Sequence, residues 1–297
     1  MTSSAMPIFL LGAMRSGTTY FRNVLSANSQ ILSLGSELNR FWTAHGVPTG
    51  AVPSCAPLSE QDITTEAIEN IRSYFERRYK TRNYPQHFCF RTYRKFRYKN
   101  ETIFKSGEPF YLLNKSTHLL NKIPLVNSVF PDAKYIYLMR DIHSQCNSLF
   151  KHFNRTEKTG RFSLSYPQKD GHCWSYIEKQ ATDPESKNWN FTDLPAYWIN
   201  LNKFALQALR QLPKSQVLIV NYTDVVKNLP DVLSTVADFL NLESINTLVS
   251  TNLINNQTSS PLTQWKNDLS KKQILDINQS IENNLTSFNF IEQNIDF

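Results

Sequence analysis

The sequence predicts an α/β fold of three layers, in which helices cover both faces of a central parallel sheet. Short apolar runs, typical of strands buried on both faces, occur at 7–12, 134–140 and 216–222. Segments with one apolar helical face follow these runs, so that strands and helices alternate along the chain, which is the pattern of a parallel sheet. The first run ends in a glycine-rich loop, at the strand-to-helix junction where such sheets bind ligands.

Length and composition are those of one globular domain. The chain has 297 residues, of which 40% are hydrophobic and 19% charged, so it can bury a large core. Because the sequence shows neither a repeat nor a linker, we predict a single domain over 1–297. Two stretches, 44–100 and 154–193, are expected to form lid-like excursions from it.

Charge and cysteine usage limit the kind of protein further. The net charge of +7 favours an anionic ligand or partner. No apolar run approaches the roughly 18–20 residues of a membrane helix, and the first residues lack the regions of a signal peptide. The four cysteines are far apart and lack metal-ligand spacing. We therefore expect reduced thiols, a cytoplasmic location and no bound metal.

Local patterns predict individual elements. Ser59 and Asp62 have the spacing of a capping box, which predicts a helix from there to about Lys80. The long polar and aromatic stretch from Asn154 to Asp193 is predicted to be a loop. Apolar periodicity predicts the other helices and strands, at 18–27, 31–34, 110–116, 193–211, 229–241 and 270–284.

The loop after the first strand has the glycine spacing of a P-loop, Gly12-x-x-x-x-Gly17-Thr18-Thr19. Its backbone N–H groups and the following helix N-terminus would surround a phosphate. Thr18 replaces the lysine that contacts the β and γ phosphates of a triphosphate, and Arg15 supplies the positive charge. A 5′-phosphate that carries a transferable group therefore fits better than Mg-ATP. On the loop alone, a turn that merely joins strand to helix is the alternative.

These residues resemble the sulfotransferases that use 3′-phosphoadenosine 5′-phosphosulfate (PAPS). Their 5′-phosphosulfate loop has the form found here as Arg15-Ser16-Gly17-Thr18-Thr19. In that family an arginine that ends a strand and a serine on the next helix bind the 3′-phosphate; Arg140 and Ser148 match them. The resemblance implies a P-loop-containing nucleotide-hydrolase-like fold, PAPS as sulfate donor, adenosine 3′,5′-bisphosphate as product, and no metal.

Two further segments carry the resemblance towards the C-terminus. Tyr222 follows the strand at 216–222 and matches a tyrosine that contacts the nucleotide, although Thr223 replaces the usual glutamate. The segment 258–269 is similar to the one that closes over the 3′-phosphate, but it lacks the basic residues of cytosolic members. The residues there that the resemblance assigns to the donor are Ser259, Ser260, Trp265 and Lys266.

The catalytic residues are implied by the tyrosylprotein-sulfotransferase branch, to which the motifs are most similar. That branch places an Asn-Lys as in Asn114-Lys115, so Lys115 joins Arg15 in stabilising the leaving phosphate. Two residues could be the base. Glu37 matches the Gly-x-Glu of the same branch, and His118 is similar to the Lys-Thr-His of cytosolic sulfotransferases. We prefer Glu37.

The acceptor is least defined by the sequence. Basic and aromatic residues in 91–99 and in 154–193 could contact it, Trp174, Trp189 and Trp198 among them, or the tryptophans could belong to the core. We expect a glycan or a hydroxylated metabolite, O- or N-sulfated, and no nucleic acid. The alternatives are a P-loop kinase or nucleotide-binding protein, and a catalytically silent glycan- or nucleotide-binding relative.

Overall fold

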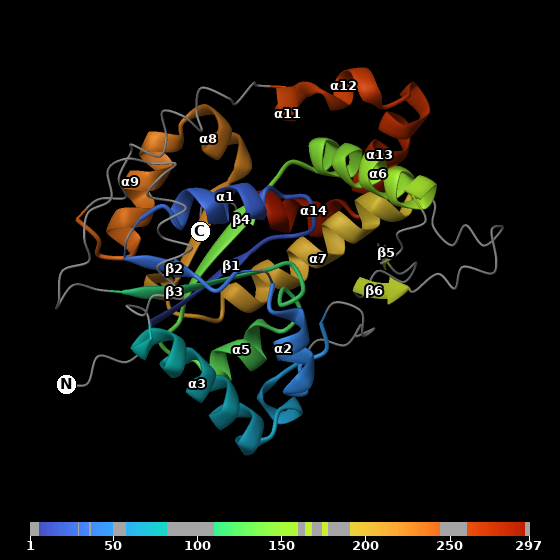
Figure 1. The fold of residues 1–297 in the computed structure, drawn as a ribbon. Helices are drawn as coiled ribbons and strands as arrows, with labels where there is room; N and C mark the ends of the chain where they lie inside the picture. The colour runs from blue at the N-terminus through green and yellow to red at the C-terminus, as the bar shows by residue number, and fades with distance from the viewer. Residues whose placement is uncertain are drawn as a thin grey trace.

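Five parallel strands form the central sheet, in the spatial order β2-β3-β1-β4-β7 (Figure 1). The strands of this sheet are β1 (Met6–Leu11), β2 (Ile31–Ser33), β3 (Tyr111–Ser116), β4 (Lys134–Met139) and β7 (Val217–Asn221). This computed structural model describes residues 6–28, 30–35, 37–49, 58–81, 110–159, 164–167, 174–177, 191–243 and 260–294. The predicted parallel sheet is confirmed.

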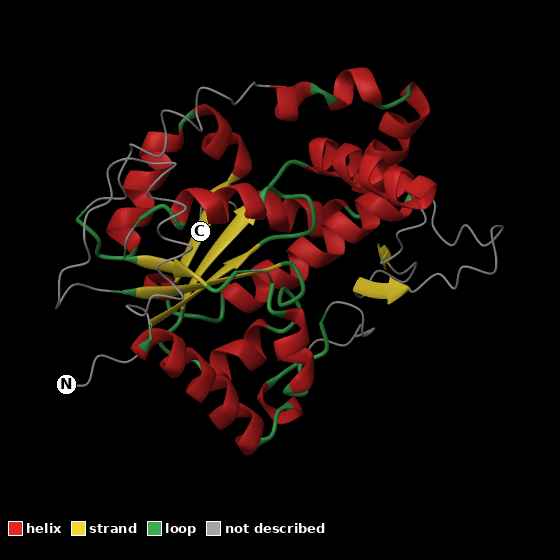
Figure 2. Ribbon diagram, viewed as in Figure 1, coloured by secondary structure: helices red, strands yellow, loops and turns green. Residues whose placement is uncertain are grey.

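Helices cover both faces of the sheet, which completes the predicted three layers (Figures 1 and 2). Near the sheet they are α1 (Thr18–Leu25), α2 (Asn39–Ala44), α3 (Thr65–Lys80), α5 (Ile123–Val129), α7 (Asp193–Leu209), α8 (Tyr222–Lys227) and α9 (Leu229–Phe239). Packed on α7 are α6 (Ile142–Thr159), α13 (Lys271–Asn283) and α14 (Leu285–Glu292), and packed on α6 are α11 (Ser260–Thr263) and α12 (Trp265–Asp268). The 3₁₀ turns are η1 (Glu60–Asp62) and η2 (Lys214–Gln216).

The central strand β1 is apolar throughout because each face of the sheet packs on a different hydrophobic core. Along β1, Phe9 and Leu11 enter the core shared with α3, α5 and α7. Ile8 and Leu10 enter the core shared with α1, α8 and α9. Alternate residues of a strand point to opposite faces, so a strand covered on both sides needs apolar residues at every position.

The capping box is present, but the helix that it predicts begins later. Ser59 and Asp62 exchange the two expected hydrogen bonds around the 3₁₀ turn η1. Helix α3 starts only at Thr65, where the Thr64 hydroxyl accepts a hydrogen bond from the Ala67 N–H, and it ends at Lys80 as predicted. Ser59 caps the 3₁₀ turn and Thr64 caps the helix, so two separate elements begin where one helix start was expected.

The stretch predicted as a loop from residue 154 contains regular structure. Helix α6 extends into it as far as Thr159. An antiparallel pair follows, β5 (Leu164–Pro167) with β6 (Trp174–Ile177). The loop prediction is therefore wrong for these described residues.

Other predicted features lie partly or wholly outside the described residues. In 44–100, the described helix α3 buries Ile71 and Phe75 in the core, while the basic and aromatic segment 89–99 lies outside the described residues. Cys146 is a free, buried cysteine. Among the residues that the structure describes, no helix has the length and apolar character needed to cross a membrane.

Candidate active site

The loop between β1 and α1 is tightly packed around its two glycines. A Cβ atom on Gly12 would lie 2.6 Å from the Ser16 hydroxyl oxygen and 2.7 Å from the Leu138 carbonyl oxygen. Gly17 has φ 101°, and a Cβ atom there would lie 2.3 Å from the Tyr222 ring. Only glycine fits both positions, because the first has no space and the second also needs a left-handed backbone.

Polar groups of this loop are left available for an anion. The Ser16 hydroxyl is buried and makes no hydrogen bond within the described part of the chain. Helix α1 follows directly, and its N-cap residue, Gly17, has no side chain that could cap it. Buried polar groups are nearly always paired, and helix N-terminal N–H groups favour negative charge. The loop therefore fits a bound phosphate group.

Three long-range hydrogen bonds hold the loop in place. The Tyr197 hydroxyl accepts from the Met14 N–H at 3.1 Å, and the Gln145 side-chain amide donates to the Met14 carbonyl at 2.8 Å. The Arg140 guanidinium donates to the Arg15 carbonyl at 3.1 Å. Arg15 itself has φ 69°, a left-handed conformation that is uncommon for a side chain of this size. These contacts from α7, α6 and the end of β4 support that conformation.

Two arginines and a serine lie together beside the loop. Arg140 follows β4 directly, and its guanidinium carbon lies 4.7 Å from the centre of the Tyr222 ring. The Arg15 guanidinium donates to the Ser148 hydroxyl on α6 at 3.1 Å. Burial lowers the pKa of Arg15, with the charge of Arg155 acting in the same direction. The sequence prediction named all four residues of this cluster, Arg15, Arg140, Ser148 and Tyr222.

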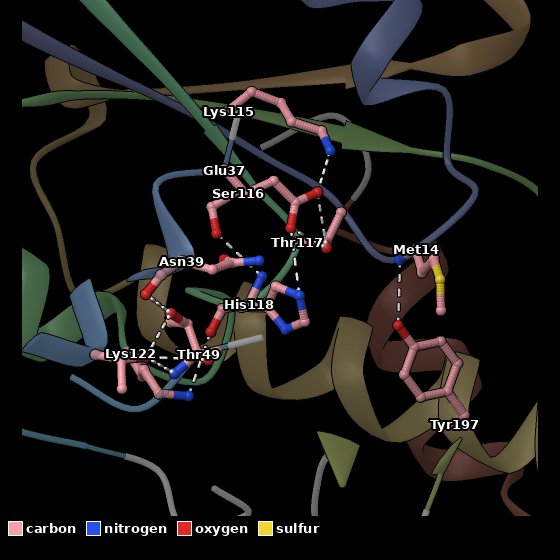
Figure 3. A network of polar contacts seen from close by, with 11 residues as sticks. Met14, Glu37, Asn39, Thr49, Lys115, Ser116, Thr117, His118, Lys122 and Tyr197 are labelled. Carbon is pink, nitrogen blue, oxygen red and sulfur yellow. Dashed lines mark hydrogen bonds and ion pairs between the residues drawn. The ribbon is translucent and has the colours of Figure 1, made fainter. Parts of the chain in front are cut away.

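A second cluster surrounds the Glu37 carboxylate (Figure 3). The Lys115 ammonium, at the end of β3, donates to Glu37 Oε1. His118 Nε2 lies 3.3 Å from Glu37 Oε2, and the Thr117 hydroxyl donates to the same oxygen at 3.1 Å. Both candidate bases and the candidate lysine are thus in one network. Leu38, the next residue, has φ 57°, which is a genuine outlier for a bulky side chain and typical of functional sites.

The charges in this cluster favour an ionised carboxylate and a neutral imidazole. Burial alone would raise the pKa of Glu37, but the charge of Lys115, that of His118 when it is protonated, and the hydrogen bonds of Lys115 and Thr117 outweigh it and hold that pKa below its usual range. Burial lowers the pKa of His118 to about 4, the Glu37 charge opposing this shift and those of Lys122 and Lys115 reinforcing it. Near neutral pH the imidazole is therefore neutral, with its Nε2 facing the carboxylate.

The C-terminal segment rests on helix α6 through α11 and α12. The Trp265 ring stacks on His143 with centroids 4.5 Å apart, and the Lys266 ammonium lies 5.7 Å from the Trp265 ring. Asp268 accepts a hydrogen bond from Asn147 at 2.8 Å and forms an ion pair with Lys151. These two residues of α6 lie before and after Ser148, so α12 contacts the helix at the position of this serine. Ser259 lies outside the described residues, and so does the side chain of Ser260.

Sequence reasoning missed several residues of the site. Tyr197, Gln145 and Thr117 act through contacts between distant segments, and no local pattern marks them. Trp198, a possible acceptor contact in the sequence, is 1% exposed and donates its indole N–H to the Arg140 carbonyl at 2.9 Å. It is part of the core, as the alternative interpretation held, and cannot stack on an acceptor. The side chains of Trp174 and Trp189 lie outside the described residues.

The sheet with its glycine-rich loop belongs to the P-loop-like α/β class of folds. The sequence model of the Sulfotransferase family matches residues 7–246, so the chain belongs to this family. A comparison with curated proteins gives no match. Among the described residues, no group of three or more His, Cys, Asp or Glu side chains could hold a metal ion.

Solved sulfotransferases are similar to this chain at low identity. The sulfotransferase domain from the curacin biosynthetic pathway is 18% identical, with 93% of this chain and 98% of that chain covered and a TM-score of 0.46. The sulfotransferase from Alicyclobacillus acidocaldarius is 14% identical, with 91% and 99% covered and a TM-score of 0.44. A mouse sulfotransferase complexed with PAP is 10% identical, with 97% and 87% covered and a TM-score of 0.46.

Proposed function

We propose that the protein transfers a sulfuryl group from PAPS to a hydroxyl or amine of its acceptor. The observation that carries this proposal is that the two clusters lie at the same edge of the sheet. The loop with Arg15 follows β1, Arg140 follows β4, and Lys115 with its partner Glu37 lies at the end of β3. These three strands are adjacent, so a donor held by the loop would have a base and a second cation within reach.

The donor would be held by the loop and by the arginine cluster. Ser16, Gly17, Thr18 and Thr19 would surround the 5′-phosphosulfate, and the buried Ser16 hydroxyl, which makes no hydrogen bond to any described residue, supports this assignment. Arg140 and Ser148 would bind the 3′-phosphate, and Tyr222 would contact the nucleotide. The C-terminal residues assigned to the donor are Ser259, Ser260, Trp265 and Lys266.

Transfer needs a base for the acceptor proton and positive charge at the leaving phosphate. PAPS supplies a sulfuryl group bonded to a phosphate oxygen; that bond breaks with its electron pair left on the phosphate as the acceptor oxygen or nitrogen bonds to sulfur. Arg15 and Lys115 would stabilise the charge on the phosphate without a metal. Glu37 would accept the proton of the acceptor, because it is ionised while its neighbour His118 is neutral and directs its Nε2 at Glu37.

Donor specificity gives the first test. We expect adenosine 3′,5′-bisphosphate to raise the melting temperature, because Arg140 and Ser148 recognise a 3′-phosphate, and ATP to raise it much less with or without Mg²⁺. A kinase or a general nucleotide-binding protein would respond more strongly to Mg-ATP. Absence of any stabilisation by the bisphosphate contradicts the sulfotransferase proposal.

The acceptor and the transfer itself need a second experiment. We propose a glycan or hydroxylated metabolite as the acceptor, and a screen with PAPS labelled in its sulfate would identify it. Binding of the bisphosphate without transfer to any acceptor would instead support a catalytically silent relative. Membership of the tyrosylprotein branch and a cytoplasmic location stay predictions of the sequence.

A further inference from the structure

Lys122 is a buried cation close to the catalytic cluster. Its side chain is 2% exposed, and its ammonium donates to the His118 carbonyl at 3.2 Å and to Asn121 Oδ1 at 2.8 Å. Lys122 also occupies the N-cap position of α5, where the helix dipole disfavours positive charge. Burying an ammonium at such a position costs free energy, even when hydrogen bonds offset part of it. A role in the site gives a reason for it.

The position of this cation relative to His118 suggests the role. In Figure 3, Lys122 and Lys115 lie on opposite sides of His118, and the Glu37 carboxylate faces the imidazole at 3.3 Å. Burial is the largest cause of the lowered pKa of His118, and among the described residues the charges that act on the imidazole are those of Glu37, of Lys122 at the start of α5 and of Lys115 from β3. One anion lies between two cations, so a third positive charge on His118 is disfavoured.

We propose that Lys122 is a positioning residue that keeps His118 uncharged, so that proton acceptance is left to Glu37. This inference rests on the proposed function. A neutral imidazole at this position, with Nε2 3.3 Å from Glu37 Oε2, would orient the carboxylate without adding a positive charge to it. A charged imidazole would pair with Glu37 as a cation and lower its basicity. Only the neutral imidazole therefore leaves the carboxylate basic enough to take the acceptor proton.

The pH dependence of transfer tests the proposal with a readout that a merely structural role would not move. The pKa of His118 is about 4, so the imidazole is neutral above that pH and the acid limb of the kcat profile should lie well below the usual histidine range. Lys122→Met removes one of the charges that lower this pKa, so protonation should occur at higher pH. We expect the acid limb of Lys122→Met to move up by about one pH unit.

Two matched variants separate charge from packing. Lys122→Arg keeps the positive charge, so the acid limb of its kcat profile should lie at the same pH as that of the native protein. In the double variant His118→Gln with Lys122→Met, the limb should match that of His118→Gln alone, because Lys122 acts through the imidazole. The proposal is overturned if the acid limb of folded Lys122→Met lies at the same pH as that of the native protein. It is also overturned if adding Lys122→Met to His118→Gln shifts the limb as much as Lys122→Met does alone.

Titration of His118 by NMR gives an answer even if Lys122→Met does not fold. In the native protein, the signals of this imidazole should show the neutral form from about pH 5 upward, whereas an unperturbed histidine titrates near 6.5. A His118 that titrates near 6.5 in the native protein contradicts the proposal. This measurement needs no turnover, so it can fail while the sulfotransferase proposal holds. Conversely, missing bisphosphate binding would reject the proposed function without moving the His118 titration.

Discussion

At the residue scale, Glu37 is the side chain on which most of the candidate chemistry depends. Three side chains from the end of β3 and the turn after it hold its carboxylate, namely Lys115, Thr117 and His118. A base must be both oriented and ionised, and these contacts provide the two conditions together. Substitution of Glu37 should therefore affect the chemical step more than it affects donor binding.

We predict that Glu37→Gln lowers kcat by about 10²–10⁴-fold, because the amide cannot accept the acceptor proton. The dissociation constant for adenosine 3′,5′-bisphosphate should change little, since the loop and the arginine cluster are untouched. Steady-state transfer assays and calorimetry measure the two quantities. His118→Gln is the matched control, and its kcat should fall less, because Glu37 would still accept the proton. Near-native turnover of Glu37→Gln would show that the base is another residue.

Gly17 sets the distance between the loop and Tyr222. We predict that Gly17→Ala is destabilised by more than the ~1–2 kcal/mol expected for a left-handed alanine, because its methyl group would overlap the Tyr222 ring. It should also bind the bisphosphate more weakly, since the loop must shift. Gly35 is the control: it has φ 97°, and no atom lies within 4 Å of the position that an alanine methyl would take, so Gly35→Ala shows the backbone cost alone. Equal unfolding free energies for the two variants would contradict the prediction.

At the element scale, the packing of α12 on α6 links the C-terminal segment to the arginine cluster. Asp268 holds Asn147 and Lys151, which flank Ser148 on α6. The aromatic stack of Trp265 on His143 adds a second contact one turn earlier. The short helix α12 therefore depends on side-chain contacts with α6 more than on its own length, since isolated short helices are unstable.

We predict that Asp268→Ala raises the KM for PAPS about tenfold and leaves kcat within about twofold, because it loosens the segment proposed to cover the donor without touching the base. Initial-rate kinetics with varied PAPS measure this separation. Glu282→Ala removes an exposed carboxylate from α13 and serves as the control. A fall in kcat with unchanged KM would mean that α12 contributes to the chemistry rather than to donor binding.

Elements differ in how well the sequence predicts them. The strands at 7–12, 134–140 and 216–222 were predictable because burial on both faces leaves an apolar run, and the loop because only glycine fits beside Ser16 and Tyr222. The late start of α3 and the regular structure after residue 154 could not be predicted from the sequence. They depend on which of two capping groups is used and on the pairing of two short strands, which local patterns do not specify.

At the scale of the whole molecule, the sheet brings together residues that the sequence could name but not place. Glu37 and His118 were rival bases in the sequence, and the fold puts them 3.3 Å apart. That contact arises because the turn after β2 and the turn after β3 meet where neighbouring strands end. Trp198, by contrast, carried no local sign of burial and lies in the core under Arg140. Contacts of this kind depend on strand order, which composition and periodicity do not reveal.

The distribution of charge over the site predicts independence from metal ions. Arg15, Arg140 and Lys115 together provide the positive charge that a divalent cation supplies in other phosphate-transferring sites. We predict that sulfuryl transfer keeps its rate in excess EDTA and gains less than about twofold from added Mg²⁺. Assays with chelated and metal-supplemented enzyme test this expectation, and a large loss in EDTA that Mg²⁺ reverses would contradict it.

The order of strands also determines how the chain must fold. The centre of the sheet pairs Met6 of β1 with Tyr111 of β3, so roughly a third of the chain must be synthesised before the first strand finds this partner. Proteins dominated by such distant pairings fold slowly and expose apolar strands while they do so. Until β3 and β4 emerge from the ribosome, the loop that we assign to the donor follows an unpaired strand. The ability to bind nucleotide should therefore arise late in folding, after β3 and β4 have paired with β1.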